Sequence, residues 1–509
     1  MPKNHSTKLF DLIQSLSSSE KRHFKVHLQK SEKHKYALLF DAMEQAPTSD
    51  DDLFKQIIYG SAAIVSKKYS ELKSYLYDLL LNSLQSFDES TSVDYFLKNN
   101  LLNIKTLYKR ARYEDCRELL HKVRRVAQEH ESFQHLLEVV QWEKQIAYAE
   151  ADINFWNTHL HRLVLEEQFY TAQTALISSL RNAFFRLLAL IRQNAAHSNS
   201  EHRATLQKII ELPYLSDFEQ LNSKKSQILY LRIFNIYYYS IHEYEDFYAS
   251  GKKLVVAMES NPAFLREDVS EYISALSNYT YSCFLQKKYS EMEIALEKFK
   301  TIRTLTTDDE TKVHRQYYQN KFAICIATGN FKEGLVALKE HLREIEKFDK
   351  NMFERSSFYY NYFYIHFGNG NFEDALDFLN QWLQLPKSVE RQDLQRVARI
   401  LNLITHLELG NFLLIESLLR SAHRFMDKSG SPDQLERKIM TYIRNISRSN
   451  DGRQKKSMTQ NLHAFFEQEK DNKLKNNLLE YFDFAAWLQS KLQGLPFAEV
   501  VRQHYAQTL

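Results

Sequence analysis

The sequence contains few of the residues that interrupt helices. Ten glycines and seven prolines occur among 509 residues, well below their average usage of about 7% and about 5%. Glycine and proline are the residues least favourable to a helix interior. Their scarcity leaves few places at which a helix could be broken, whereas Leu, Lys, Glu, Tyr and Phe are abundant. We therefore predict an all-α chain, and its length favours several domains or one elongated array over a single compact core.

Cysteines and long apolar runs are also scarce. The three cysteines, Cys116, Cys283 and Cys325, are too few and too scattered for a disulfide framework, which indicates a reducing compartment. Residues 1–20 begin polar and lack the apolar core of a signal peptide. No run approaches the roughly 18 apolar residues of a membrane span. We expect a cytoplasmic protein with no membrane partner.

No charge of one sign dominates the chain. Lys and Arg number 67 against 64 Asp and Glu, a formal net charge of +3, so strong attraction of the whole chain to nucleic acid is not expected. A local candidate for a nucleic-acid patch is formed by Lys21, Arg22, Lys25 and Lys30. These residues would contact phosphates if they belonged to a helix-turn-helix module. The turn glycine common in that motif is missing, and the alternative, a solvated helix face, is the interpretation we prefer.

The first ninety residues are predicted to form a separate helical bundle, for which the helix-turn-helix interpretation stays open. Ser17 and Glu20 have the spacing of a capping box, which predicts a helix over 18–29. Further helices are predicted over 35–44, 50–58 and 62–85. The third of these four helices begins with acidic residues, which complement the positive end of the helix dipole.

A short phrase then recurs at near-constant spacing. Gly-Asn-Phe occurs at 329–331, 370–372 and 410–412, each time between two helical runs. Degraded copies of this turn begin at positions 111, 242 and 287, whereas 134–212 shows no clear turn phrase. A period of about 40 residues is typical of a solenoid, in which neighbouring units must stack to bury their apolar faces. We predict a repeat array over 91–450 and C-terminal capping helices over 451–509.

The best copy resembles a tetratricopeptide repeat. The residues that carry the resemblance are Tyr359, Phe363, His366, the run 370–376, Leu379, Trp382 and Pro386. The likeness is strongest over 317–426, and it is loose because the units exceed the family's usual 34 residues and carry bulky side chains seven residues before the turn, where the family has a small one. The resemblance implies a right-handed α-solenoid that binds peptides or protein segments on its concave face, with no cofactor and no reaction of its own.

The family register also implies which residues face the groove, namely those three, six and ten positions before each turn. Those we select as ligand-binding are Arg232, Tyr239, Tyr281, Gln319, Tyr360 and Tyr364. Tyr and Arg are enriched where partners bind, but the tyrosines could instead fill the seam between helices. We expect a non-catalytic protein- or peptide-binding scaffold. The alternative is a transcriptional regulator with a DNA-binding N-terminal module and a peptide-sensing repeat domain.

Residue types that bind zinc recur four positions before successive turns, as Cys283, Cys325, His366 and His406. Equivalent positions on stacked helices lie about 8–10 Å apart, too far for one ion whose ligands lie within about 2.0–2.3 Å. No Gly-rich phosphate loop, HExxH, Gly-x-Ser-x-Gly or Cys-x-x-Cys occurs. We expect no metal, no cofactor and no enzymatic activity, and the sequence predicts neither the partner's identity nor the oligomeric state.

Overall fold

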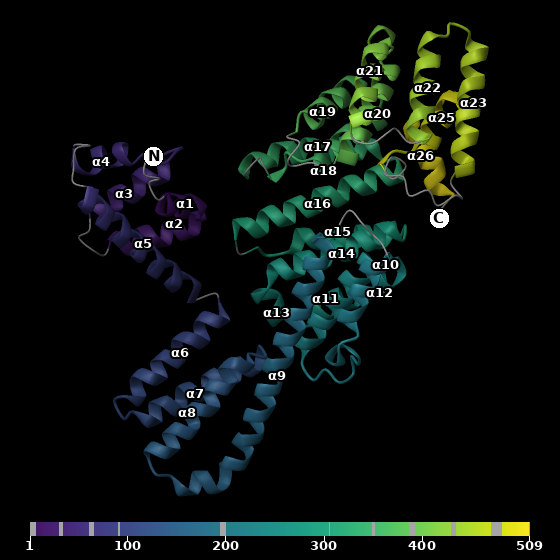
Figure 1. The fold of residues 1–509 in the computed structure, drawn as a ribbon. Coiled ribbons are helices and arrows are strands. Elements are labelled where there is room, and N and C mark those ends of the chain that lie inside the picture. Colours follow the sequence, from purple (N-terminus) through teal and green to yellow (C-terminus); the bar gives the residue numbers. More distant parts are fainter. Residues whose placement is uncertain are drawn as a thin grey trace. The chain divides into compact units, whose positions relative to one another are not determined.

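The fold is all-α, as predicted. A computed structural model describes residues 7–29, 34–60, 66–89, 92–193, 200–304, 306–348, 352–385, 392–428, 434–469 and 481–507. These residues form 25 packed α-helices and two 3₁₀ turns, and no strand occurs among them (Figure 1). The chain divides into two compact units, which we describe separately. Unit 1 comprises Met1–Ser282 and Arg303–Glu310, and unit 2 comprises Cys283–Ile302 and Thr311–Leu509.

Unit 1 begins with a bundle of five helices around one apolar core. The helices are α1 (Lys8–Ser15), α2 (Ser18–Gln29), α3 (His34–Gln45), α4 (Asp51–Tyr59) and α5 (Ser66–Glu89). The capping box is confirmed, because the Ser17 amide donates to Glu20 Oε2 at 2.7 Å and the Glu20 amide donates to Ser17 Oγ at 3.3 Å. Asp50 caps α4 in the same way by accepting from two backbone amides of its first turn.

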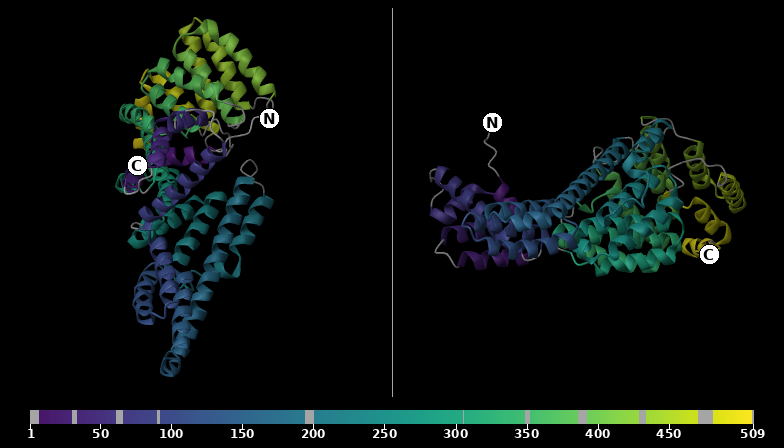
Figure 2. Two further views of the ribbon diagram at one scale, coloured as in Figure 1. Left: turned by 90° about the vertical axis from the view of Figure 1, so that its left-hand side faces the viewer. Right: turned by 90° about the horizontal axis from the view of Figure 1, so that it is seen from below.

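Longer helices follow in unit 1. They are α6 (Val93–Tyr108), α7 (Tyr113–Glu129), α8 (Phe133–Ala149), α9 (Ile153–Gln193), α10 (Ser200–Ile210), α11 (Lys224–Ser240), α12 (Tyr244–Glu259), α13 (Pro262–Glu267) and α14 (Val269–Leu285), whose last residues belong to unit 2. Helices α6, α7, α8 and α9 pack consecutively against one another (Figure 1 and Figure 2). The 41-residue α9 also packs on α11.

Helix α9 is long and apolar enough, by length and composition alone, to cross a membrane. No membrane span was predicted from the sequence. One helix of this kind is weak support for a membrane span, since core helices of soluble proteins pass the same test. In this structure α9 contacts α8, α10 and α11 of its own unit, and 22% of its apolar window is buried.

Unit 2 contains the remaining helices. They are α15 (Tyr289–Thr301), most of α16 (Thr307–Thr328), α17 (Phe331–Glu344), α18 (Ser356–Gly368), α19 (Phe372–Gln384), α20 (Gln392–Glu408), α21 (Phe412–Lys428), α22 (Gln434–Arg448), α23 (Gly452–Glu469), α25 (Phe484–Gln493) and α26 (Phe497–Ala506). A single apolar cluster joins the helices from α18 to α26, with Trp382 and Trp487 among its fully buried side chains. Residues 482–483 are not helical and precede α25 directly.

One turn geometry recurs at eight connections between consecutive helices among the described residues. Its first residue has a left-handed backbone in every case: Ala111, Glu131, Ala151, His242, Lys287, Gly329, Gly370 and Gly410, with φ between 46° and 80°. In most of them the next residue donates its amide to the carbonyl five positions back, as Asn371 does to His366 at 3.0 Å. This closure satisfies carbonyls that a helix end leaves unpaired. The turn phrase therefore marks a backbone geometry that recurs along the chain.

Two of these turns, at Glu131 and Ala151, were missed from the sequence. They lie 20 and 40 residues after Ala111, inside or next to the stretch without a recognised phrase. A usable signal was present, because every left-handed residue is followed two positions later by an aromatic or branched apolar residue that starts the next helix. At the missed turns these are Phe133 and Ile153.

Candidate functional site

The six predicted groove residues divide between the two units. In unit 1, Tyr239 on α11 and Tyr281 on α14 are 41% and 42% exposed. Their ring centroids lie 6.0 Å apart in an edge-to-face arrangement, and the Tyr239 ring also contacts Phe247. The two rings together form an exposed aromatic pair on neighbouring helices. We call Tyr239 and Tyr281 the open tyrosine pair.

The third predicted residue of unit 1, Arg232, is occupied within the fold. Its guanidinium lies 4.5 Å from the ring centroid of Phe184, a cation–π contact. It also forms an ion pair with Glu271. Arg232 thus stands ten residues before the turn, as predicted, but its charge already has an intramolecular partner.

A buried polar network holds the helices of the open tyrosine pair together. The fully buried Asn235 side chain donates to the Phe247 carbonyl at 2.9 Å and to Ser250 Oγ at 3.1 Å. Its Oδ1 accepts from Asn278 Nδ2 at 3.2 Å. Gly251 lies so close that an added Cβ would stand 3.1 Å from the Asn235 amide nitrogen. Because such satisfied networks specify one packing arrangement, α11, α12 and α14 are fixed relative to one another.

In unit 2 the predicted groove is filled. Tyr360 and Tyr364 lie on α18, but residues 481–507, which we call the C-terminal segment, cover both rings. The Tyr360 hydroxyl donates to the Tyr481 carbonyl at 3.0 Å, and the Tyr364 hydroxyl accepts from the Asp483 amide at 3.2 Å. Tyr364 is only 4% exposed, and burial raises the pKa of both phenols above the usual value. The expectation that these two tyrosines face an open groove is corrected by this contact.

The C-terminal segment contacts four successive hairpins of unit 2. Tyr505 meets Tyr289, beside the turn at 287, with ring centroids 5.3 Å apart. Phe497 stacks on Phe331, which follows the next turn. Further contacts join Phe482 to Phe367 before the third turn, and Trp487 Nε1 to Glu408 before the fourth, at 2.7 Å. A stretch of chain with aromatic side chains therefore packs along successive hairpins. Each of these contacts joins residues that are far apart in the sequence.

Gln319, the remaining predicted residue, is half-buried on α16. Its Nε2 donates to Ser357 Oγ at 3.2 Å, so it links two helices of unit 2. Nothing in these contacts involves the tyrosines of α18.

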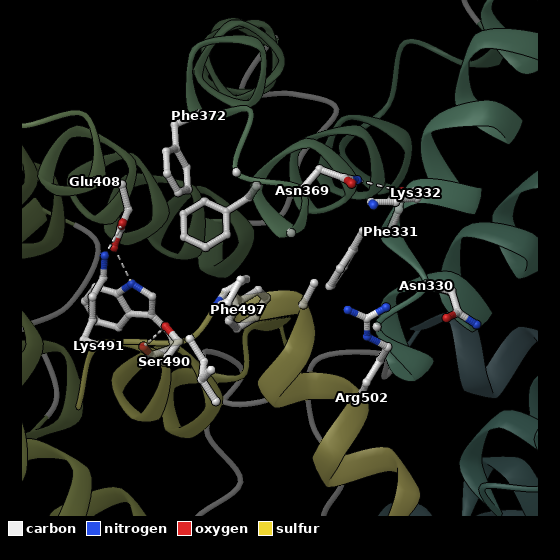
Figure 3. Close-up of a pocket in the computed structure, with 18 of the residues that line it drawn as sticks. Asn330, Phe331, Lys332, Asn369, Phe372, Glu408, Ser490, Lys491, Phe497 and Arg502 are labelled. Carbon is white, nitrogen blue, oxygen red and sulfur yellow. Dashed lines mark hydrogen bonds and ion pairs between the residues drawn. The ribbon is translucent and has the colours of Figure 1, made fainter. Parts of the chain in front are cut away.

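A cavity of about 800 Å³ lies where the C-terminal segment passes the turns at 329 and 370 (Figure 3). Its walls include the rings of Phe331, Phe372, Phe497 and Trp487. Charged side chains at the cavity are Lys332, Glu333, Glu408, Lys491 and Arg502. Sequence reasoning missed this site because it depends on packing between residues more than a hundred positions apart.

The candidate nucleic-acid patch is largely neutralised by α3. Lys25 Nζ lies 2.9 Å from Asp41 and 2.6 Å from Glu44, and Lys21 lies 3.9 Å from Glu44. These hydrogen bonds to Glu44 and Asp41 raise the pKa of Lys25. Arg22 is exposed, and Lys30 lies outside the described residues. The paired lysines offer less positive charge to a phosphate backbone than the sequence implied.

The Cys and His residues that stand four positions before the turns are buried or half-buried. Cys283 and Cys325 are buried, and burial raises the pKa of the Cys325 thiol to about 12. His366 Nδ1 lies 3.3 Å from Asp374. Throughout the part of the chain that the structure describes, no three metal-ligating side chains converge.

Sequence reasoning also missed a buried histidine pair in unit 2. His314 Nε2 and His341 Nδ1 are 2.9 Å apart, and His341 Nε2 is hydrogen-bonded at 2.5 Å to the Tyr362 hydroxyl. Burial lowers the pKa of His314 to about 4, with Lys347 adding to the effect, and that of His341 to about 3, with His314 adding to it. Both rings are therefore neutral at pH 7, and the pair joins α16, α17 and α18.

Comparison of the chain with models of protein families, with curated proteins and with solved structures finds no match.

Proposed function

We propose that this chain is a non-catalytic scaffold of tetratricopeptide-like hairpins, arranged as a right-handed solenoid, that binds a peptide or protein segment. We place it in the cytoplasm. The recurrent left-handed turn, followed two positions later by an aromatic or branched apolar residue, supports the hairpin unit. Three buried cysteines without a disulfide are in keeping with a reducing compartment.

One observation carries the binding proposal: tyrosines on the first helix of a hairpin hold a segment of the same chain in unit 2, whereas tyrosines on such helices are exposed in unit 1. Tyr360 and Tyr364 stand ten and six residues before the turn at 370, and they hold a segment of the same chain through its backbone. Tyr281 stands six residues before the turn at 287, and Tyr239 three before the turn at 242. Tyr239 and Tyr281 are 41% and 42% exposed, so a segment of another protein can reach the exposed part of their rings.

The chemistry of the filled site indicates what the open tyrosine pair would bind. On α18 the tyrosine hydroxyls bond to backbone groups, the Tyr364 ring contacts Phe482 and Phe497, and the Tyr360 ring contacts Tyr481. A segment with aromatic side chains and accessible backbone groups at 481–483 satisfies both kinds of contact. We therefore infer that the partner presents an aromatic-containing segment to Tyr239 and Tyr281. Exposed tyrosines bind such segments at modest entropic cost because they combine large area with a polar tip.

Affinity capture from an extract of the native cell tests this function. The full chain is compared with the double variant Tyr239→Ala/Tyr281→Ala and with a control in which two other exposed aromatics of unit 1 are removed, Tyr148→Ala/Phe185→Ala. We expect proteins retained by the wild type and the control to be lost from the first variant, at equal melting temperature. Equal retention by all three would contradict the proposal. The DNA-binding alternative has no specific observation in its favour, since two of its three described basic residues are paired with carboxylates.

A further inference from the structure

The cavity beside the C-terminal segment has the composition of a small-molecule site. Its volume of about 800 Å³ falls within the roughly 300–1,000 Å³ that is usual for ligand pockets. Phe331, Phe372 and Phe497 line it, and Lys332 and Arg502 lie at one end of it, on either side of the Phe331 ring (Figure 3). An apolar floor with a few convergent polar groups is the arrangement that binds small ligands.

The charges of this cavity do not cancel internally. Glu408 accepts from Trp487 Nε1 and pairs with Lys491, so its carboxylate is satisfied. Glu333 pairs with Lys321, which lies outside the cavity lining. Among the described residues no carboxylate lies within ion-pair distance of Lys332. Arg502 pairs with Glu499 through Nη2 alone. Both acidic groups are thus already occupied, whereas Lys332 and part of the Arg502 guanidinium remain available to an anion.

The backbone around the cavity is arranged so that these groups stay in place. A Cβ on Gly329 would stand 2.9 Å from the Ala498 carbonyl oxygen and 2.9 Å from Arg502 Cγ, so α26 approaches this turn as closely as glycine permits. A Cβ on Gly368 would lie 2.3 Å from the Phe331 ring, which therefore rests directly on the α18 backbone. The Asn369 side chain donates to the Phe331 carbonyl at 2.7 Å. The Phe331 ring and the first turns of α26 are consequently in close contact with the backbone of this part of unit 2.

We propose that this cavity binds a small anion with an aromatic body, the anionic group lying between Lys332 and Arg502 and the aromatic body lying against Phe331, Phe372 and Phe497. The site is separate from the open tyrosine pair, and it does not depend on the scaffold function. Carboxylates and sulfonates accept charge-assisted hydrogen bonds from both cations, and the aromatic walls contribute apolar burial and ring contacts. An uncharged ligand of the same shape would use the walls alone.

Two fluorescent probes test the charge requirement on the intact chain. 8-Anilinonaphthalene-1-sulfonate carries the aromatic body and the anion, and N-phenyl-1-naphthylamine carries the body alone. The double variant Lys332→Gln/Arg502→Gln is compared with Lys339→Gln/Arg343→Gln, which removes two exposed charges from the same α17 helix outside the cavity. We expect the sulfonate to bind the wild type and the control with a Kd below about 1 mM, and to bind the first variant about tenfold more weakly. The uncharged probe should not distinguish the variants.

Competition against the bound sulfonate distinguishes two kinds of natural ligand, a free aromatic acid and the C-terminal carboxylate of a peptide. N-Acetyltryptophan is compared with N-acetyltryptophanamide, which lacks the carboxylate, and with a longer peptide that ends in tryptophan with a free carboxylate. Displacement by N-acetyltryptophan alone indicates a free aromatic acid, and displacement by the peptide as well indicates a chain end. The proposal is overturned if the sulfonate fails to bind, if Lys332→Gln/Arg502→Gln leaves its affinity unchanged, or if the amide competes as well as the acid.

Discussion

The hydroxyl of Tyr364 accepts a hydrogen bond from the backbone amide of Asp483 at 3.2 Å, although 119 residues separate them. Through this contact part of the C-terminal segment covers α18. Tyr364 is nearly inaccessible, and Phe482 and Phe497 pack on its ring. A residue expected to bind a partner instead contributes to the stability of its own unit.

Substitution of Tyr364 should therefore destabilise unit 2. Tyr364→Phe leaves the Asp483 amide without its partner, at an expected cost of about 1–3 kcal/mol. Tyr364→Ala also removes the buried ring, and we expect a loss of about 3–5 kcal/mol. The measurement is urea unfolding followed by tryptophan fluorescence, to which Trp382 and Trp487 of this unit contribute. Tyr148→Ala, at an exposed ring, should change the midpoint little; equal effects of both alanine variants would show that the covering contact contributes nothing.

Two turn glycines allow a matched test of the contact between α26 and the turn at 329. Gly329 and Gly370 both have left-handed backbones, with φ of 72° and 80°, so alanine at either should cost about 1 kcal/mol through backbone strain. At Gly370 an added Cβ meets open space, whereas at Gly329 it meets the Ala498 carbonyl and Arg502. Gly329→Ala should therefore be the more destabilising of the two in urea unfolding, and should also weaken binding of the anionic probe. The reverse order would contradict the packing of α26 on this turn.

Replacing a non-glycine residue at the left-handed position of this turn by glycine should stabilise the protein. Ala111 and Ala151 have φ of 53° and 52° and are exposed. Relief of left-handed strain in Ala111→Gly or Ala151→Gly is expected to raise the stability of unit 1 by up to about 1 kcal/mol. The matched control is Ala172→Gly in the exposed face of α9, which should lower it by about 1 kcal/mol. If thermal unfolding showed that glycine changes the stability in the same direction at the turns and in α9, the shared left-handed turn geometry would be refuted.

The buried histidine pair predicts a loss of stability in acid. The folded-state pKa values of His314 and His341 are lowered to about 4 and about 3, whereas an unfolded histidine titrates near about 6.5. Below that value the unfolded chain binds protons that the folded chain does not, so stability falls as the pH drops from about 6.5 toward 4. At pH 5 each ring should cost about 2 kcal/mol relative to pH 7.5.

Urea midpoints measured at pH 7.5 and pH 5 check this dependence. His341→Gln should reduce the difference between the two midpoints, although it lowers stability at pH 7.5 because Tyr362 and His314 lose a hydrogen-bond partner. His121→Gln, at an exposed ring of unit 1, should leave the difference unchanged. A pH dependence that is identical in the wild type and His341→Gln would show that other groups dominate the acid response.

Local signals in the sequence were sufficient for the all-α class and for several helix ends. The capping box at Ser17 and Glu20 is formed as predicted. The Gly-Asn-Phe phrase marks turns that share one backbone geometry with the weaker copies at Ala111, His242 and Lys287. These features depend on residues at most five positions apart. The turns at Glu131 and Ala151 were missed, although an apolar residue two positions later, Phe133 or Ile153, starts the next helix as it does at the recognised turns.

The candidate site was less predictable, because it depends on contacts between distant residues. Nothing near Tyr360 indicates that the Tyr481 carbonyl accepts from its hydroxyl. The cavity likewise needs the C-terminal segment to pass the turns at 329 and 370. The pairing of Lys25 with Asp41 and Glu44 is a further case in which tertiary packing alters the role of charges that looked clustered and open in sequence.

The most direct test of the scaffold function is photo-crosslinking from the open tyrosine pair. A benzophenone amino acid placed at position 281 in the full chain is irradiated in the native cell, and the same amino acid at position 148 serves as the exposed control. The account predicts that position 281 yields discrete adducts with another protein, that position 148 does not, and that the crosslinked partner peptides contain aromatic residues. Adducts that are absent at position 281, or equally abundant at both positions, would contradict it.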